Sequence, residues 1–251
     1  MKSKTKDSEA LGPASIFELI IPNNNSKYRV FNKEFKDWES HIDYHIRKRD
    51  DFENDYTSKK DARLLKLAKE HAFAYEKSTE APSWITLTHP FYVFLTHGSE
   101  LKSPGVKADA RSYLDVLTNL LTSDICRDRA NIVIFETLHH YAAATSRLLE
   151  QGLVDKVVFT HYDTGHVLDC RELKKGNQDY YSGGGYNGRC FKHSLSSMKN
   201  VVDTDQISIV TDLVIDSPED RSDGLMPKKI ETPRDEAIKS ITLAELYNAL
   251  R

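Results

Sequence analysis

The chain has 251 residues, 39% of them hydrophobic and 29% charged, a length that suits one large domain or one domain with an appendage. Lysine and arginine total 35 and aspartate and glutamate total 38, so the formal net charge is −3, which argues against nucleic acid as a partner. Cys126, Cys170 and Cys190 lack Cys-x-x-Cys spacing, which favours a reducing compartment, and a cytoplasmic location is expected. No apolar run approaches the ~20 residues of a membrane span, so no membrane anchor is expected.

The N-terminal segment, residues 1–82, is charged and aromatic, and predicts a short tail followed by a helical extension. A strand is expected over Ile16–Ile21, ended by Pro22. From Asn32, hydrophobic side chains recur every three or four residues, and a second pattern of this kind covers Lys60–Lys77, so two helices are expected. An exposed apolar stripe on these helices would suit self-association into a homo-oligomer.

Residues 83–251 alternate short apolar runs with amphipathic stretches, as βαβ units do. Strands are expected at 91–95, 131–135, 157–159 and 207–215, helices at 108–123 and 141–151, and a last strand and helix within 241–250. This order predicts an α/β domain with a mainly parallel sheet and helices on both faces. In such sheets the site lies at the carboxyl ends of the strands, where the sequence has His97, Glu136, His139, His140, His161, Asp163 and Asp212.

The most informative stretch begins with the three glycines at 183–185, which allow the backbone to approach a ligand closely. The helix expected after them would present a positive dipole end to Cys190, where a thiolate is stabilised and the thiol pKa is lowered. Arg189, Lys192 and His193 would add positive charge. The pattern predicts a nucleophilic cysteine or a place that holds an anion.

From Leu87 to Leu250 the chain resembles the isochorismatase-like cysteine hydrolases. Gly185–Ser197 is similar to that family's glycine turn, nucleophilic cysteine and following helix. Ile207–Asp212 resembles the strand and aspartate that come next, and Ser240–Leu246 resembles the closing strand and helix. The resemblance implies a small-molecule hydrolase without a cofactor, which acts on an amide or related carbonyl compound.

In that family a cysteine attacks a carbonyl or nitrile carbon with help from an aspartate and a lysine. The resemblance therefore implies Cys190 as nucleophile. The family's aspartate ends the opening strand, where this chain is expected to have Thr96-His97, and His139 and His140 lie near the place of the lysine. His97 is the candidate base. The candidate substrate-binding residues are Gly185, Arg189, Lys192, His193, His139, His140 and Asp212.

Two other functions stay open. With the aspartate and lysine missing, the chain could be a catalytically inactive scaffold or assembly protein, in which Cys190 is a small buried residue at a helix start. His161, Asp163 and His166 have metal-ligand residue types at close spacing, which would suit a metal-dependent hydrolase. The run 180–186, rich in tyrosine and glycine, is expected to form a lid, an aromatic wall or a surface loop.

Overall fold

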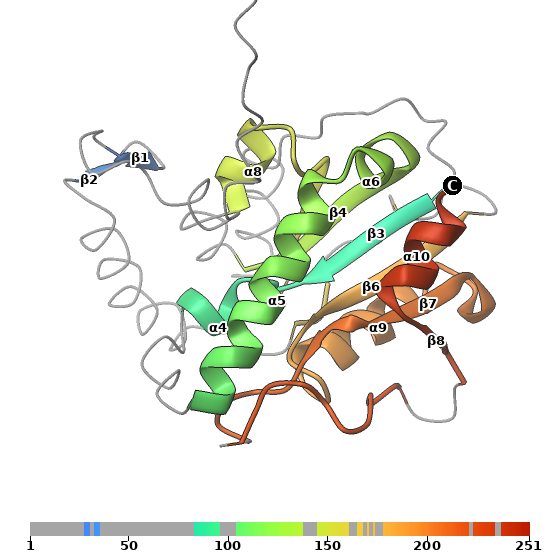
Figure 1. Ribbon diagram of the computed structural model, residues 1–251. Helices are drawn as coiled ribbons and strands as arrows, with labels where there is room; N and C mark the ends of the chain where they lie inside the picture. Colours follow the sequence, from blue (N-terminus) through green and yellow to red (C-terminus); the bar gives the residue numbers. More distant parts are fainter. Residues whose placement is uncertain are drawn as a thin grey trace, which may run out of the picture.

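The computed structural model describes residues 28–30, 33–35, 83–95, 104–137, 145–160, 165–167, 170, 173, 178–220, 223–233 and 237–251. Its main feature is a sheet of six strands, all parallel to their neighbours (Figure 1). In chain order the strands are β3 (Ser83–Thr88), β4 (Ala130–Glu136), β5 (Lys156–Phe159), β6 (Asp179–Gly185), β7 (Ile207–Ile215) and β8 (Lys239–Ile241). In space their order is β5-β4-β3-β6-β7-β8.

Helices cover both faces of this sheet. They are α4 (Tyr92–Leu95), α5 (Pro104–Thr122), α6 (Asp124–Arg129), α8 (Ser146–Glu150), α9 (Cys190–Met198) and α10 (Leu243–Ala249), with a 3-10 turn at Thr204–Gln206. In Figure 1, α5 and α10 lie in front of the sheet and α9 lies behind it. The predicted α/β class, with a parallel sheet between helices, is confirmed.

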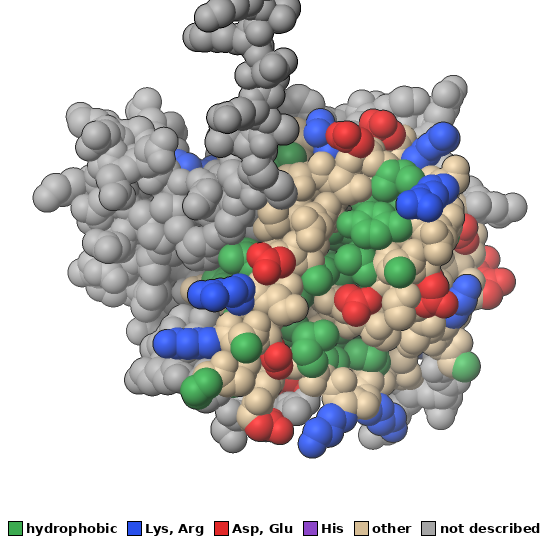
Figure 2. Space-filling model, viewed as in Figure 1, with side chains coloured by type: hydrophobic (Ala, Val, Ile, Leu, Met, Phe, Trp, Pro, Cys, Tyr) green, Lys and Arg blue, Asp and Glu red, His purple; other side chains and the backbone are tan. Residues whose placement is uncertain are grey.

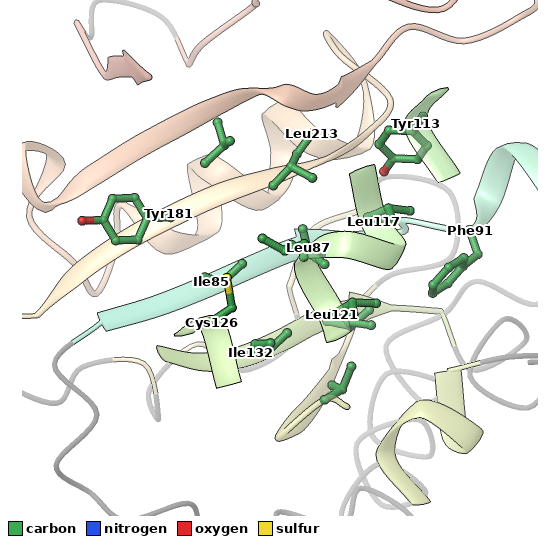
Figure 3. Close-up of a cluster of buried hydrophobic side chains, with 14 of the residues drawn as sticks. Ile85, Leu87, Phe91, Tyr113, Leu117, Leu121, Cys126, Ile132, Tyr181 and Leu213 are labelled. Carbon is green, nitrogen blue, oxygen red and sulfur yellow. The ribbon is translucent and has the colours of Figure 1, made fainter. Parts of the chain in front are cut away.

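The alternation of side chains along β3 divides the core into two layers. Ile85 and Leu87 point to one face, where they pack with Leu117 of α5 in the larger hydrophobic cluster (Figure 3). Trp84 belongs to the second cluster, together with Phe191 and other residues of α9. Because each large apolar side chain contributes about 1.5–3 kcal/mol when it is fully buried, these two layers hold α5 and α9 firmly against the strands.

The order of the strands places a topological switch point between β3 and β6. Within the six-stranded sheet, the chain passes first through β3 and then outward through β4 and β5. It then crosses to the other side of β3 and forms β6. The two strands approach closely at Gly184, where an added Cβ would lie 2.1 Å from the carbonyl oxygen of Thr88. In open α/β sheets, ligands bind in the crevice at the carboxyl ends of the strands at such a point.

The opening strand differs from the prediction. Phe91–Leu95 was expected to be a strand, and this is wrong, because Tyr92–Leu95 forms the short helix α4 and the strand is Ser83–Thr88. Pro90 accounts for the end of β3, since proline lacks the N–H that a sheet ladder needs, and its fixed φ angle suits the turn that leads into α4. The residue that follows the opening strand is therefore His89.

The tyrosine- and glycine-rich run is also different from the prediction. It was expected to be a lid, wall or loop, but Asp179–Gly185 is β6, a central strand between β3 and β7. Tyrosine favours strands, and the glycines lie where neighbours come close; a Cβ on Gly183 would lie 2.4 Å from the Cβ of Leu213. The turn comes later, where Gly188 has a φ of 71°.

Near the N-terminus, Tyr28–Val30 (β1) and Lys33–Phe35 (β2) form an antiparallel pair, so the expected start of a helix from Asn32 is wrong over 33–35. The other elements expected within residues 1–82, and their apolar stripe, lie outside the described residues. The predicted helix at 108–123 and the strands at 131–135, 157–159 and 207–215 are confirmed. The described part of the predicted helix 141–151 is α8.

Among the described helices, none is long and apolar enough to cross a membrane. On the face shown in Figure 2, the described acidic and basic side chains lie interspersed around small hydrophobic areas. This mixture agrees with the small net charge of the chain.

Candidate functional site

Cys190 is the first residue of α9, directly after the turn that follows β6. As the sequence predicts, this places it at the N-terminal end of a helix. That helix end lies beside the switch point. Cys190 is half-buried, whereas Cys126 and Cys170 are buried. The backbone N–H groups of Arg189 and Phe191 both donate to the carbonyl oxygen of Tyr186, which holds the turn before the helix.

A stripe of α9 residues spaced four apart faces β3. Met198 accepts a hydrogen bond from Thr86 at 3.7 Å between sulfur and oxygen. One turn nearer the start of the helix, the hydroxyls of Ser194 and Thr88 lie 2.6 Å apart. Cys190 is one further turn along, and residues spaced four apart lie on the same side of a helix. The cysteine is therefore placed just beyond the carboxyl end of β3.

Two of the three cations expected to surround Cys190 are paired with carboxylates. The guanidinium of Arg189 lies 3.1 Å from Glu219 and 2.7 Å from Asp220. The ammonium of Lys192 lies 3.1 Å from Glu231. Exposed pairs of this kind contribute little stability, about 0–1 kcal/mol each, but they offset the positive charge. The substrate-binding roles of Arg189 and Lys192 stay predictions.

Part of the chain between β5 and β6 lies against the side of α9; we call residues 165–167 the covering segment. An added Cβ on Gly165, whose φ is 69°, would lie 2.6 Å from both the Cα and the Cβ of Cys190. The rings of His166 and His193 have centroids 4.5 Å apart. Only glycine fits over the cysteine in this arrangement.

Hydrogen bonds fix the end of the covering segment. The backbone N–H of Val167 donates to the Ser197 hydroxyl at 3.1 Å, and that hydroxyl donates to the carbonyl oxygen of His193 at 3.1 Å. Val167 also forms an antiparallel bridge with Thr160, just after β5. The segment thus runs along the helix side that carries Cys190, His193 and Ser197.

A second polar group, the strand-end cluster, lies at the carboxyl ends of β3, β4 and β5. It consists of the buried side chains of His89, Glu136, Thr145 and Thr160. The His89 Nε2 atom lies 2.8 Å from the Thr160 hydroxyl. The two carboxylate oxygens of Glu136 accept hydrogen bonds from the Thr137 N–H and the Thr145 hydroxyl, each at 2.9 Å.

Burial raises the pKa of Glu136 to about 7, although the positive charge of His89 and the hydrogen bonds from Thr145 and Thr137 lower it part of the way. Burial also raises the pKa of Tyr113 on α5, and the negative charge of Glu136 raises it further. The Tyr113 hydroxyl is buried and has no hydrogen-bond partner among the described residues. A carboxyl group with a pKa near 7 can both give and take a proton at neutral pH.

The two groups are held by different strands of the sheet. The hydrogen bonds of His89 and Glu136 reach Thr160 and Thr145, on the β4 and β5 side. Cys190 follows β6, on the other side. The carboxyl edge of the sheet therefore carries a half-buried thiol and, separately, a buried acid–base cluster.

Two of the predicted substrate-binding residues have contacts within the fold. Gly185 ends β6, and an added Cβ would lie 3.0 Å from the Cγ1 of Ile215. The Asp212 carboxylate accepts a hydrogen bond from the Leu243 N–H at 2.6 Å, at the start of α10. These contacts give both residues structural roles, and their part in substrate binding stays a prediction.

Three predicted histidines lie outside the described residues: the candidate base His97, and His139 and His140 near the place of the family's lysine. Two residues of the predicted metal site, His161 and Asp163, also lie outside them. Only His166 of that alternative is described, and its ring packs on His193. Within the described ranges, no group of three or more His, Cys, Asp or Glu side chains is arranged to hold a metal ion.

Sequence reasoning selected Glu136 as a strand-end residue but missed His89, Thr145 and Thr160. The signal for His89 was available, because it lies between Pro90 and the strand-forming run Trp84-Ile-Thr-Leu-Thr88. The order of the strands and the helices on both faces of the sheet make the molecule an open, doubly wound α/β protein with polar groups at its carboxyl edge.

No family model, curated protein or solved structure matches the chain.

Proposed function

We propose that the protein is a small-molecule hydrolase that cleaves an amide or related carbonyl compound through Cys190. The observation that carries the proposal is the place of this half-buried cysteine, at the first position of α9 and beside the β3–β6 switch point. Ligands of open α/β sheets bind at this edge, and a helix N-terminus favours a thiolate. The resemblance to the isochorismatase-like cysteine hydrolases supports the same chemistry.

The reaction would proceed through a thioester. The Cys190 sulfur, having lost its proton, forms a bond to the carbonyl carbon, and the π electrons of the carbonyl move onto its oxygen. Collapse of this tetrahedral intermediate expels the amine, which takes up one proton. Water then adds to the thioester and displaces the thiol, so the net change is the addition of one water across the amide bond.

The resemblance now assigns a different residue to the place of the family's aspartate. That aspartate ends the opening strand, and here the opening strand is followed by His89 rather than by His97. His89 is hydrogen-bonded to Thr160, which follows β5. We therefore do not assign His89 the role of that aspartate toward the thiol.

Alkylation of the native protein tests the proposal without knowledge of the substrate. Iodoacetamide is added across a pH series, and the modified cysteines are mapped by mass spectrometry. We expect Cys190 to react first, with a midpoint well below the ~8.5 of a free thiol. The buried Cys126 and Cys170 serve as internal controls. A Cys190 that reacts no faster than these two in the folded protein would contradict the proposal.

The second candidate is a catalytically inactive scaffold or assembly protein. It is favoured by the carboxylates that offset Arg189 and Lys192, and by the contact of Gly165 on Cys190. The same alkylation series separates it from the hydrolase, since an inert Cys190 supports the scaffold. The metal-dependent hydrolase, the cytoplasmic location and the homo-oligomer stay predictions from the sequence.

A further inference from the structure

Three successive residues of the covering segment meet three positions on one side of α9. Gly165 lies on Cys190, His166 packs on His193, and the Val167 N–H binds Ser197. A single side of the helix is thus matched, residue by residue, by a second piece of chain. The match places the paired rings of His166 and His193 next to the contact between Gly165 and Cys190 along the helix.

His193 is three positions after Cys190 on this helix. Residues three apart on a helix are neighbours, with Cβ atoms about 5–6 Å apart. His193 is half-buried, and its ring packs on the ring of His166. Its backbone carbonyl oxygen accepts a hydrogen bond from the Ser197 hydroxyl. Catalytic hydrogen bonds are often long in a protein without substrate and tighten when substrate binds.

Among the described residues, three other basic groups at this edge of the sheet have partners of their own. Arg189 and Lys192 form ion pairs with carboxylates. His89 is hydrogen-bonded to Thr160 across β4. An imidazole changes its charge in the neutral range, which is what a base for a thiol requires.

We propose that His193, held by His166 of the covering segment, accepts the proton of Cys190. The inference rests on the proposed function and adds the base to it. His193 takes the proton from the Cys190 sulfur and passes it to the nitrogen of the departing amine. In the second half, His193 takes a proton from the attacking water and returns it to the sulfur, so that the enzyme is restored without net gain or loss of protons.

The test compares the pH profile of Cys190 alkylation by iodoacetamide in the full-length wild-type protein, His193→Gln and His166→Gln. Glutamine keeps polarity and approximate size but cannot serve as a base. The matched control is Lys199→Gln, which changes a residue at the far end of the same helix, about 13 Å along the axis from Cys190. Circular dichroism and thermal unfolding confirm that each variant is folded.

We expect His193→Gln to slow alkylation at pH 7 by about tenfold and to move the midpoint of the profile toward that of a free thiol. His166→Gln should produce a smaller shift in the same direction, and Lys199→Gln should match the wild type. A folded His193→Gln variant with an unchanged profile overturns the inference and leaves Cys190 as nucleophile. An inert Cys190 in the wild type overturns the proposed function itself, and the inference with it.

Discussion

At the scale of single residues, Glu136 is the most unusual group. Its carboxyl is completely buried at the end of β4, and burial raises its pKa from an ordinary 4.5 to about 7. Two hydrogen bonds satisfy its oxygens, at 2.9 Å each. An ionisable group is seldom buried in this way without a partner or a function.

The raised pKa of Glu136 makes a prediction for stability. Below pH 4.5 the carboxyl is protonated whether the protein is folded or unfolded. Between 4.5 and about 7 it stays protonated only in the folded protein, so the unfolded chain binds fewer protons and the free energy of unfolding falls as pH rises. A shift of this size corresponds to roughly 3 kcal/mol.

Urea unfolding between pH 4 and 8 would measure this loss. We expect Glu136→Gln to remove most of the decline, because glutamine does not ionise, while the exposed Asp128→Asn keeps it. A wild-type protein whose stability is equally high at pH 4.5 and 7.5, or a Glu136→Gln variant with an unchanged slope, would show that the carboxyl is not protonated as described.

At the scale of elements, the covering segment depends on one glycine. Gly165 has a φ of 69° and touches Cys190, whereas Gly152, after α8, has a φ of 68° and would meet no atom within 4 Å if it carried a Cβ. The two positions therefore have nearly the same positive φ angle and differ in the contact. Alanine substitutions at the two positions form a matched pair, because their difference in free energy of unfolding measures the effect of the contact with Cys190.

Gly152→Ala should cost about 1 kcal/mol from its backbone conformation alone. Gly165→Ala should cost more, on the order of 2–3 kcal/mol, or else release the segment and speed the alkylation of Cys190, because a Cβ has no space there. Chemical unfolding and alkylation rates of the two variants measure these effects. Equal stabilities together with equal alkylation rates would show that the segment does not lie on the cysteine.

The elements also show what could be predicted from the pattern of residues. Helix α5 was predictable because its leucines recur at helical spacing. Strands β4 and β5 were predictable because their apolar runs are short and rich in β-branched residues. β6 was missed because tyrosine and glycine suggest a loop, although in this sheet the glycines let β3 and β7 approach. Hydrophobic periodicity does not carry that information.

At the scale of the whole molecule, the α/β class followed from the alternation of apolar runs and amphipathic stretches. The candidate site was predictable only in part. Cys190 was placed correctly at the start of its helix, since a turn and a helical pattern are local features. The strand-end cluster and the contact of residues 165–167 with α9 join segments far apart in the chain, and local patterns do not reveal such contacts.

The central claim is that Cys190 attacks a carbonyl carbon at the carboxyl edge of the sheet. Reaction of the native protein with para-nitrophenyl acetate, quenched at low pH and mapped by mass spectrometry, tests it most directly. We predict that the native protein carries an acetyl group on Cys190 and that the Cys190→Ala variant does not acquire this modification. In the urea-unfolded protein, Cys190 should be acetylated no faster than Cys126. Acetylation of lysines alone, with Cys190 unmodified, would contradict the account.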